Sequence, residues 1–273
     1  MPAQPTRAPL VILIHGLSGC EESAYIQTSA RHLLAQGYRV LRLNLRGAGP
    51  SRASCGGHYH AGRSEDLRAA LAVLRERGES EYLLFAYSLG ANMMLKALGE
   101  GEGLAGVRGA VAVSAPIDLA AASARFAKPR NAPYQRWLLH HMKREATGEG
   151  ARLNEAERQA IMEAKTVRAF DDRFVAPRHG FAGADDYYAK SSAAPYLRRI
   201  IIPTLVIHAA DDPWIPAASY RCQDWSNPAL GLLMPSSGGH VGFHGRGSHV
   251  PWHDRCAVRF LQRQTETVLP QGE

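Results

Sequence analysis

Ser88 lies in the stretch FAYSLGANMM, between an apolar run and the start of a predicted helix. Ala86 and Gly90 stand two positions before and two positions after it. A very tight turn from a strand into a helix requires small residues at these positions and exposes the serine hydroxyl at the helix N-terminus. The spacing therefore favours a serine nucleophile. Taken alone, the stretch also allows a helix-capping serine, because the usual first residue of this pattern is glycine rather than alanine.

A serine hydroxyl needs a general base to accept its proton and a carboxylate to orient that base. In this strand–turn–helix setting the chain order of the three groups is Ser, then Asp or Glu, then His. Two later apolar runs are followed by the loops ADDPWIP and PSSGGHVGF. We predict that His240 is the base. We predict that Asp212 orients it, because Asp212 stands four residues before Pro216, and that Asp211 caps the turn.

The first apolar run ends in HGLSG, a turn that supplies backbone N–H groups. We predict that the N–H groups of Leu17 and Leu89 bind the oxyanion of a tetrahedral intermediate. His15, in the same turn, is expected to hold the loop rather than to transfer protons. This chemistry requires no metal and no organic cofactor.

The remaining histidines show no HExxH pattern and no metal-ligand spacing with carboxylates, so we predict no metal site. Surface or supporting roles are expected for His58, His60, His140, His141, His244, His249 and His253.

Six short apolar runs, rich in Val, Ile and Leu, are bounded by turn residues and fit buried parallel strands. They cover residues 10–14, 39–44, 82–86, 110–114, 204–209 and 230–234. Helical patterns at 23–37, 64–78 and 89–101 lie between the first four, and Ser64 is a candidate N-cap. The alternation predicts an α/β fold with a mostly parallel central sheet flanked by helices.

The alternation breaks at residues 118–198, where helices and loops are expected without a strand. We interpret this stretch as a helical cap inserted in a single domain that spans residues 1–273. Its aromatic side chains either line an apolar pocket or form core packing. They are Tyr134, Trp137, Phe170, Phe174, Phe181, Tyr187 and Tyr188.

The formal net charge is +7, but the 32 basic residues are spread along the chain and match no nucleic-acid-binding motif. No nucleic-acid partner is therefore expected. The four cysteines form no CxxC pair and are expected to be free thiols. The first nine residues lack an export signal and the apolar runs are too short to span a bilayer, which predicts a cytoplasmic protein without stable membrane insertion. The sequence does not indicate an oligomeric state.

A series of motifs resembles a known family. In chain order they are HGLSGCEESAYI, LNLRGAG, YHAG, AYSLGANMMLKALGE, VSAPIDL, DYYAKSSA, IPTLVIHAADDP and GGHVGF, within residues 10–245. They are similar to the motifs of the YheT-like branch of the α/β-hydrolases, relatives of eukaryotic ABHD-type hydrolases and of yeast ethanol acyltransferase/esterases. The resemblance implies an α/β-hydrolase fold and a Ser–Asp–His serine hydrolase, with Ser88, Asp212 and His240 in these roles.

The chain departs from the family pattern at two alanines and at its N-terminus. Family members generally have glycine at the positions of Ala86 and Ala91, so the first alanine is expected to strain the turn and the second to crowd the oxyanion site. Relatives also carry an N-terminal segment with additional strands. A smaller, more open sheet and a differently built acyl pocket are expected here.

The predicted function is that of a carboxylesterase acting on small-molecule esters, with short- to medium-chain acyl groups. Three alternatives use the same fold: an acylglycerol lipase or phospholipase, an alcohol acyltransferase, and a non-catalytic protein that binds acyl ligands.

Overall fold

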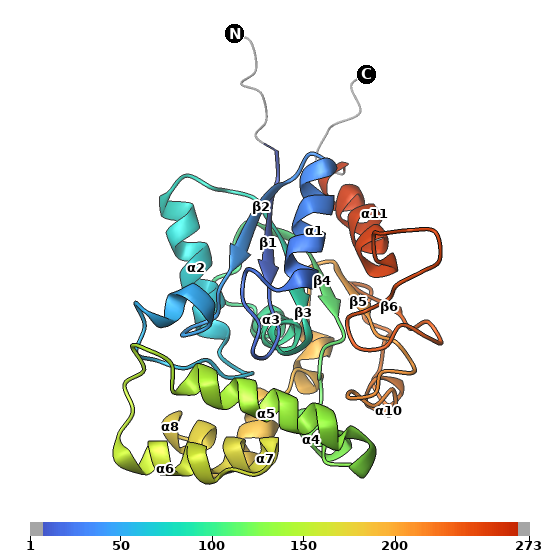
Figure 1. Cartoon of the computed structure of the whole chain (residues 1–273). Coiled ribbons are helices and arrows are strands. Elements are labelled where there is room, and N and C mark those ends of the chain that lie inside the picture. Colours follow the sequence, from blue (N-terminus) through green and yellow to red (C-terminus); the bar gives the residue numbers. More distant parts are fainter. Residues whose placement is uncertain (1–7, 267–273) are drawn as a thin grey trace, which may run out of the picture.

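A six-stranded sheet forms the centre of the protein, whose computed structural model describes residues 8–266. All neighbouring strands are parallel, in the order β2-β1-β3-β4-β5-β6 (Figure 1). The strands are β1 (Leu10–Ile14), β2 (Arg39–Leu43), β3 (Tyr82–Tyr87), β4 (Val107–Val113), β5 (Thr204–Ile207) and β6 (Leu230–Leu233). The six predicted strands are all present, and the predicted parallel α/β fold is confirmed.

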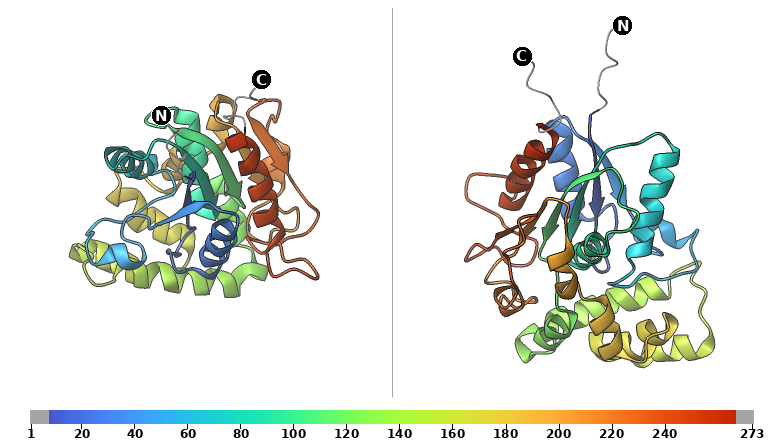
Figure 2. Two further views of the ribbon diagram at one scale, coloured as in Figure 1. Left: turned by 90° about the horizontal axis from the view of Figure 1, so that it is seen from above. Right: turned by 180° about the vertical axis from the view of Figure 1, so that it is seen from behind.

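Helices cover both faces of the sheet, which explains why the central strands read as continuous apolar runs. α1 (Ala24–Ala35) and α11 (Trp252–Glu266) lie on one face, and α2 (Ser64–Glu76) and α3 (Ser88–Glu100) lie on the other (Figures 1 and 2). Side chains alternate along β1, so that Ile12 and Ile14 join the core beneath α2 and α3, and Val11 and Leu13 join the core beneath α1 and α11.

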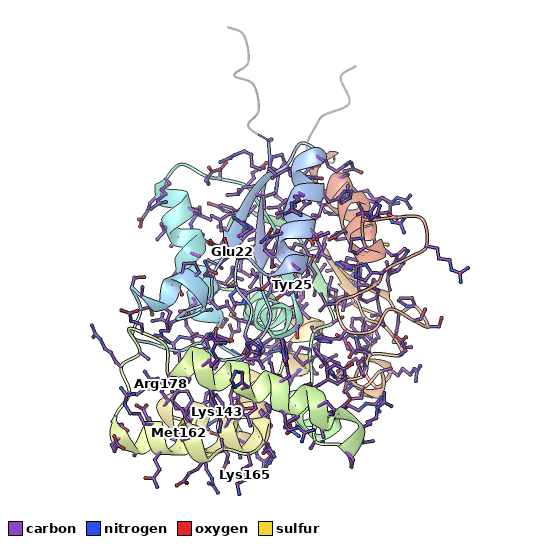
Figure 3. The ribbon with its side chains drawn as sticks, viewed as in Figure 1. Glu22, Tyr25, Lys143, Met162, Lys165 and Arg178 are labelled. Carbon is purple, nitrogen blue, oxygen red and sulfur yellow. The ribbon has the colours of Figure 1, made fainter. Side chains whose placement is uncertain are left out.

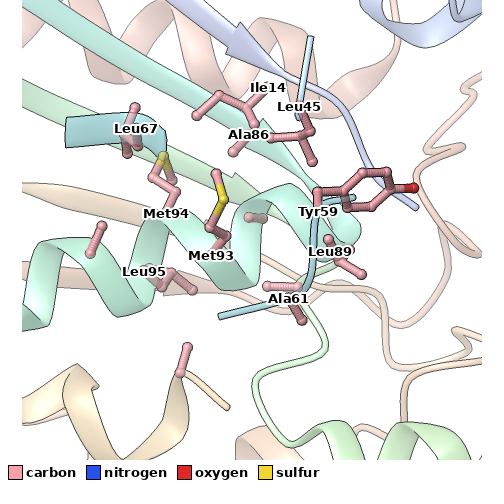
Figure 4. Packing of buried hydrophobic residues seen from close by; sticks show 14 of the residues in the cluster. Ile14, Leu45, Tyr59, Ala61, Leu67, Ala86, Leu89, Met93, Met94 and Leu95 are labelled. Atoms are coloured by element: carbon pink, nitrogen blue, oxygen red, sulfur yellow. The ribbon is translucent and has the colours of Figure 1, made fainter. Parts of the chain in front are cut away.

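α3 is buried along nearly its whole length. Met93 and Met94 fill the space between this helix, the sheet and α2 (Figure 4). Gly90 lies so close to β1 that a Cβ atom there would be 2.2 Å from the His15 carbonyl oxygen. Gly90, two residues after Ser88, therefore lets the helix start directly against the neighbouring strand.

Six α-helices lie between β4 and β5, together with 3₁₀-helical turns at Pro129–Asn131 and Ala194–Arg199, at the edge of the sheet toward which the strands point (Figures 1 and 2). We call them the cap helices: α4 (Leu119–Phe126), α5 (Ala132–Ala146), α6 (Glu155–Glu163), α7 (Val167–Phe170), α8 (Ala176–Arg178) and α9 (Ala184–Ser191). A π-helical turn, Asp171–Val175, joins α7 to α8. One further helix, α10 (Ala218–Arg221), follows β5.

The two ends of the cap segment meet. The N–H of Ala194 donates to the carbonyl oxygen of Ile117 at 2.9 Å, so the chain returns to the point where it left β4. Asn92 of α3 fixes this point, because its side chain donates to the carbonyl of Ser191 at 2.8 Å and accepts from the N–H of Ala193 at 2.9 Å. The helix that follows Ser88 therefore anchors the cap helices.

Polar contacts hold the cap helices to one another and to the loop after β2 (Figure 3). The Arg178 guanidinium pairs with Glu157 at 2.5 Å and donates to the carbonyl oxygen of Gly56 at 3.0 Å. Lys143 of α5 donates to the carbonyl oxygen of Met162 at 2.8 Å, at the end of α6. No helix within residues 8–266 is both long enough and apolar enough to cross a membrane.

The predicted N-cap of α2 is wrong. Arg63 occupies the N-cap position and Ser64 is the first residue of the helix, without a capping hydrogen bond from its side chain. The Ser64 hydroxyl instead donates to the Glu100 carboxylate of α3 at 2.5 Å. A contact with a distant element has replaced the local one.

Candidate active site

Ser88 stands on a strained turn between β3 and α3. Its φ is +48°, a left-handed conformation that a side chain with a Cβ seldom adopts, whereas Tyr87 before it has extended backbone angles. Strain of this kind persists only where the surroundings enforce it. The packing of Gly90 against His15 supplies that enforcement and places the Ser88 hydroxyl at the N-terminal end of α3.

The structure brings the side chains of Ser88, His240 and Asp212 together from three loops at the same edge of the sheet. His240 Nε2 lies 3.0 Å from Ser88 Oγ, and His240 Nδ1 lies 2.8 Å from Asp212 Oδ2. An ionised carboxylate can only accept, so Nδ1–H must be the donor to Asp212. Nε2 is then free to accept the proton of the Ser88 hydroxyl.

The adjacent Asp212 and Asp211 have different partners. Asp212 is buried, and its second oxygen accepts from the N–H groups of Trp214 at 2.8 Å and Ile215 at 2.9 Å. Asp212 therefore caps the turn, and the prediction that Asp211 does so is wrong. Asp211 accepts instead from the N–H of Gly239 at 2.9 Å, in the loop that carries His240.

The His240 loop has an unusual backbone, and side chains from other loops hold it in place. Val241 has a φ of +65°, which is rare for a β-branched residue. Its N–H donates to the hydroxyl of Ser114, at the end of β4, at 3.2 Å. The Trp214 ring lies beside the His240 ring, with 4.5 Å between centroids. These contacts limit the positions that the imidazole can take.

The two predicted oxyanion residues, Leu17 and Leu89, line the same cavity as Ser88. Leu89 is the second residue of α3, so its N–H has no acceptor within the helix. No protein acceptor is found for the Leu17 N–H among residues 8–266. Gly16 brings this loop close to the nucleophile, because a Cβ on Gly16 would lie 2.9 Å from the Ser88 Cβ.

A tyrosine supports the loop of residues 16–18, which carries the predicted oxyanion residue Leu17 and which we call the oxyanion loop. The Tyr59 hydroxyl accepts from the N–H of Ser18 at 2.8 Å and donates to the Glu145 carboxylate of α5 at 2.8 Å. His15 supports the loop from the other side, since its Nε2 accepts from the N–H of Leu45 at 3.0 Å. Burial lowers the pKa of His15 to about 4, so the ring is neutral at pH 7 and serves a structural role.

A cavity of about 320 Å³ lies between Ser88 and the cap helices, and its walls are mostly apolar. Four of the seven aromatic side chains singled out in the cap line it: Trp137, Phe170, Tyr187 and Tyr188. Phe174 and Phe181 pack in the core instead, and Tyr134 is exposed on the outside against Trp214. Phe170, Tyr187 and Tyr188 also belong to the buried core, so the two predicted roles overlap in these residues.

The other histidines do not all lie at the surface. His58 is buried, His58 and His60 line the cavity, and burial lowers the pKa of each to about 3. His253 is also buried, whereas His244 and His249 are exposed. Within the described part of the chain, residues 8–266, no three His, Cys, Asp or Glu side chains are grouped to hold a metal ion. All four cysteines are free thiols.

The two alanines that depart from the family pattern fit their sites. Ala86 is a buried strand residue paired with Ile14 and Ala112, and it has no positive φ that would require glycine. The strain falls on Ser88 instead. Ala91 is buried in the core and is absent from the cavity lining, so the expected crowding of the oxyanion site is not found.

Sequence reasoning missed several residues that shape this site. Ser114 and Trp214 hold the His240 loop, and Tyr59 supports the oxyanion loop. A signal existed for Ser114, because it ends a predicted strand whose neighbours carry the candidate catalytic groups. Tyr59 acts on a residue 41 positions away, and no local pattern indicates that contact.

Comparison with known proteins agrees with this fold. Residues 9–246 match the α/β hydrolase fold family. The chain is 35% identical over 252 residues to the Escherichia coli (strain K12) protein named "Putative esterase YheT", covering 89% of this chain and 73% of that one. It is 29% identical over 276 residues to a Saccharomyces cerevisiae monoacylglycerol lipase, covering 97% and 61%, and 26% identical over 239 residues to human phospholipase ABHD3, covering 86% and 58%.

Solved structures show the same fold at lower identity. The Pyrococcus furiosus esterase Pf2001 superposes with a TM-score of 0.60 at 20% identity, over 93% of this chain and 83% of that one. Est1E from Butyrivibrio proteoclasticus, with ferulic acid bound, gives a TM-score of 0.58 at 14% identity, over 96% and 91%. Together, the matched residues and the parallel sheet establish that the chain belongs to the α/β-hydrolase fold family.

Proposed function

We propose that this chain hydrolyses carboxylic esters through a covalent acyl-enzyme formed on Ser88. The observation that carries the proposal is the hydrogen-bonded path from Ser88 Oγ through His240 to the buried Asp212, at the wall of an apolar cavity. A hydroxyl, an imidazole and a carboxylate in this order form the arrangement that activates a serine. The named esterase and lipase relatives support the same chemistry.

In the first step, Ser88 Oγ bonds to the ester carbonyl carbon while its proton passes to His240 Nε2. The carbonyl oxygen becomes an oxyanion, to which the N–H groups of Leu17 and Leu89 donate. The bond to the alcohol then breaks, and His240 returns the proton to the leaving oxygen. Asp212 stabilises the imidazolium during both transfers.

In the second step, water attacks the acyl carbon and gives a proton to His240 Nε2. The acid leaves when the bond to Ser88 Oγ breaks and the serine regains its proton. Every proton in this cycle moves through one imidazole nitrogen, so the cycle needs no further acid or base.

A short- to medium-chain acyl group is the substrate class that we propose. The cavity of about 320 Å³ is apolar and lies at the lower end of the range of about 300–1,000 Å³ for small-molecule sites. A panel of p-nitrophenyl esters from acetate to palmitate tests this assignment. A maximum of kcat/KM between about four and ten carbons supports it, and a maximum at palmitate contradicts it. The cytoplasmic location stays a prediction.

Labelling with a fluorophosphonate probe tests the nucleophile directly. We expect labelling of the native chain and none in Ser88→Ala, together with loss of p-nitrophenyl butyrate hydrolysis. Ser54→Ala is the matched control, because Ser54 is exposed and is absent from the cavity lining. Full hydrolysis by Ser88→Ala contradicts the mechanism. A native chain that binds acyl ligands and resists labelling is a binding protein.

Acyl transfer to an alcohol is a second candidate function. A Saccharomyces cerevisiae relative, 25% identical over 291 residues, is named "Medium-chain fatty acid ethyl ester synthase/esterase 2". An alcohol can replace water in the second step because it offers the same attacking oxygen and proton. Measuring the ratio of ethyl ester to free acid in the presence of ethanol separates the two functions. A ratio above the ethanol-to-water molar ratio favours the transferase.

A further inference from the structure

One helical face of the cap carries a single carboxylate among apolar side chains. Val167, Asp171 and Val175 are spaced four residues apart, and all three line the cavity together with Phe170. A helix face turned toward an apolar cavity normally carries apolar residues. Asp171 places a carboxylate on this apolar face, and the residue is only 8% exposed to solvent. Carboxylates are seldom buried without a partner, so this one calls for an explanation.

The protein supplies only some of the hydrogen bonds that the Asp171 carboxylate can accept. The Tyr188 hydroxyl donates to Oδ2 at 2.7 Å, and the Ser123 hydroxyl lies 3.2 Å from the same tyrosine oxygen. Among residues 8–266, no other hydrogen-bond donor to this carboxylate is found. An ionised carboxylate can accept about four hydrogen bonds. Because Asp171 lines the cavity, a bound molecule could donate the hydrogen bonds that the protein does not supply.

Among residues 8–266, no cation pairs directly with the buried Asp171 carboxylate. Arg168 lies one helical turn earlier, but its guanidinium pairs with Asp185 on the outside of the cap at 2.8 Å. Asp171 also begins the π-helical turn Asp171–Val175. Turns of this type are rare and occur frequently at functional sites.

We propose that Asp171, together with Tyr188 and Ser123, forms a polar subsite that binds a hydroxyl group of the ester substrate. This inference rests on the proposed ester hydrolysis and narrows its substrate class to esters that carry a hydroxyl group away from the ester bond. The three polar side chains all line the cavity that contains Ser88. The hydroxyl belongs either to the acyl chain or to the alcohol part.

The ionisation of Asp171 suits a hydroxyl better than a cation. Burial raises the pKa of this carboxyl group to about 7. Near neutral pH the group therefore exists in both its ionised and its protonated form. A hydroxyl can donate to the first form and accept from the second, whereas an ammonium group can bind only the first.

Matched ester pairs test the subsite. For the acyl arm, p-nitrophenyl 6-hydroxyhexanoate is compared with p-nitrophenyl hexanoate. For the alcohol arm, 2,3-dihydroxypropyl butyrate is compared with propyl butyrate. We define the hydroxyl preference as the ratio of kcat/KM for the hydroxylated ester to kcat/KM for its partner. A purely structural role of Asp171 would change both values together and leave this ratio constant.

In one of the two arms, Asp171→Leu is expected to lower the hydroxyl preference about 10-fold or more, the usual effect of losing a hydrogen bond to a charged group. Asp171→Ala is measured alongside, because it removes the carboxylate without adding volume. Asp172→Asn is the matched control, since Asp172 is the adjacent carboxylate, is exposed and is absent from the cavity lining. It is expected to leave the ratio unchanged.

Three results would overturn the proposal. The first is an unchanged preference in both arms for the Asp171 variant that remains folded. The second is an equal change in Asp172→Asn. The third is a preference lost in Tyr188→Phe but kept in Asp171→Ala, which would assign the recognition to the tyrosine alone.

Calorimetric titration separates this proposal from the proposed function. The alcohol-arm pair is titrated into Ser88→Ala and into Ser88→Ala/Asp171→Ala, and the ratio of the two dissociation constants is compared. A chain that hydrolyses no ester but loses its binding preference with Asp171 would refute the esterase and support the subsite. A chain that hydrolyses esters but shows no hydroxyl preference in kinetics or in binding would support the esterase and refute the subsite.

Discussion

The hydroxyl of Tyr59 accepts the Ser18 N–H at 2.8 Å and so joins the oxyanion loop to a residue that lies 41 positions later. The same hydroxyl donates to Glu145 at 2.8 Å, which extends the connection to the cap helix α5. A single side chain therefore links the loop beside Ser88 with the cap helix α5, which lines the cavity.

Tyr59→Phe removes both hydrogen bonds and keeps the ring. Because the Leu17 N–H then loses a rigid support, we expect kcat to fall about 10-fold, less than the loss of about 100-fold or more for removing an oxyanion donor outright. KM should change less than threefold, since the apolar wall is retained. Steady-state kinetics with p-nitrophenyl butyrate measure both values. Glu145→Gln is the control, because it leaves the Ser18 contact in place, and an unchanged kcat in Tyr59→Phe would contradict the supporting role.

The two adjacent aspartates should differ strongly in their effect on turnover. Asp212→Asn removes the charge that orients and stabilises the His240 imidazole, so kcat should fall by roughly 10³–10⁴-fold. Asp211→Asn retains an oxygen that can accept from Gly239, and a loss of less than about 10-fold is expected. Pre-steady-state and steady-state rates of ester hydrolysis provide the test. Equal losses in the two variants would mean that Asp212 acts only on the loop conformation.

Ala86→Gly restores the residue usual for the family, yet it should not improve the enzyme. Ala86 is a buried strand residue with no need of glycine's backbone freedom. The substitution should lower the free energy of unfolding by about 1–2 kcal/mol, from lost strand rigidity and the lost methyl group, and leave kcat within twofold. Urea unfolding and ester kinetics measure these effects. Ala112→Gly, on the paired strand, should destabilise similarly, and a large rise in kcat in Ala86→Gly alone would show that the alanine strains the turn.

Buried histidines should make the protein sensitive to acid. Burial lowers the pKa of His15 from 6.5 to about 4, while the unfolded chain keeps the ordinary value. Between pH 6.5 and 4 the unfolded state therefore binds more protons, so stability falls as the pH falls through this window, by roughly 3 kcal/mol for this residue. His58, His60, His179, His208 and His253 are lowered to about 3–4 and add in the same direction.

Urea unfolding at a series of pH values tests this expectation. In His15→Gln the number of protons taken up on unfolding between pH 6.5 and 4 should fall by about one, whatever the change in overall stability. His249→Gln is the control, because His249 is exposed. An identical proton uptake in the native chain and in His15→Gln would show that His15 is not held neutral in the fold.

The strands were predictable because each is marked by a run of adjacent apolar residues. All five residues of β1 are buried, since helices cover both faces of the sheet, and such a strand must be a continuous apolar run. The order Ser88, Asp212, His240 was also readable, because each follows a predicted strand and parallel strands end at one edge. Family resemblance added the sequence of motifs around them.

What could not be predicted depends on contacts between distant residues. Ser64 would cap α2 on local grounds, but Glu100 of α3 binds its hydroxyl. Asp211 was predicted to cap the turn, but the path of the loop gives that role to Asp212 and turns Asp211 toward the N–H of Gly239. The aromatic spacing of the cap indicates helices but does not distinguish Trp137, which lines the cavity, from Phe174, which packs in the core.

The hydrogen bond between Ile117 and Ala194 brings together the two ends of the segment that holds the cap helices, so this segment leaves the sheet and returns to it at one place. Replacing them with a stretch of another length would leave the spacing of β4 and β5, and hence the three loops around Ser88, where they are. A change within this one segment would therefore alter the walls of the cavity without moving the three loops beneath it.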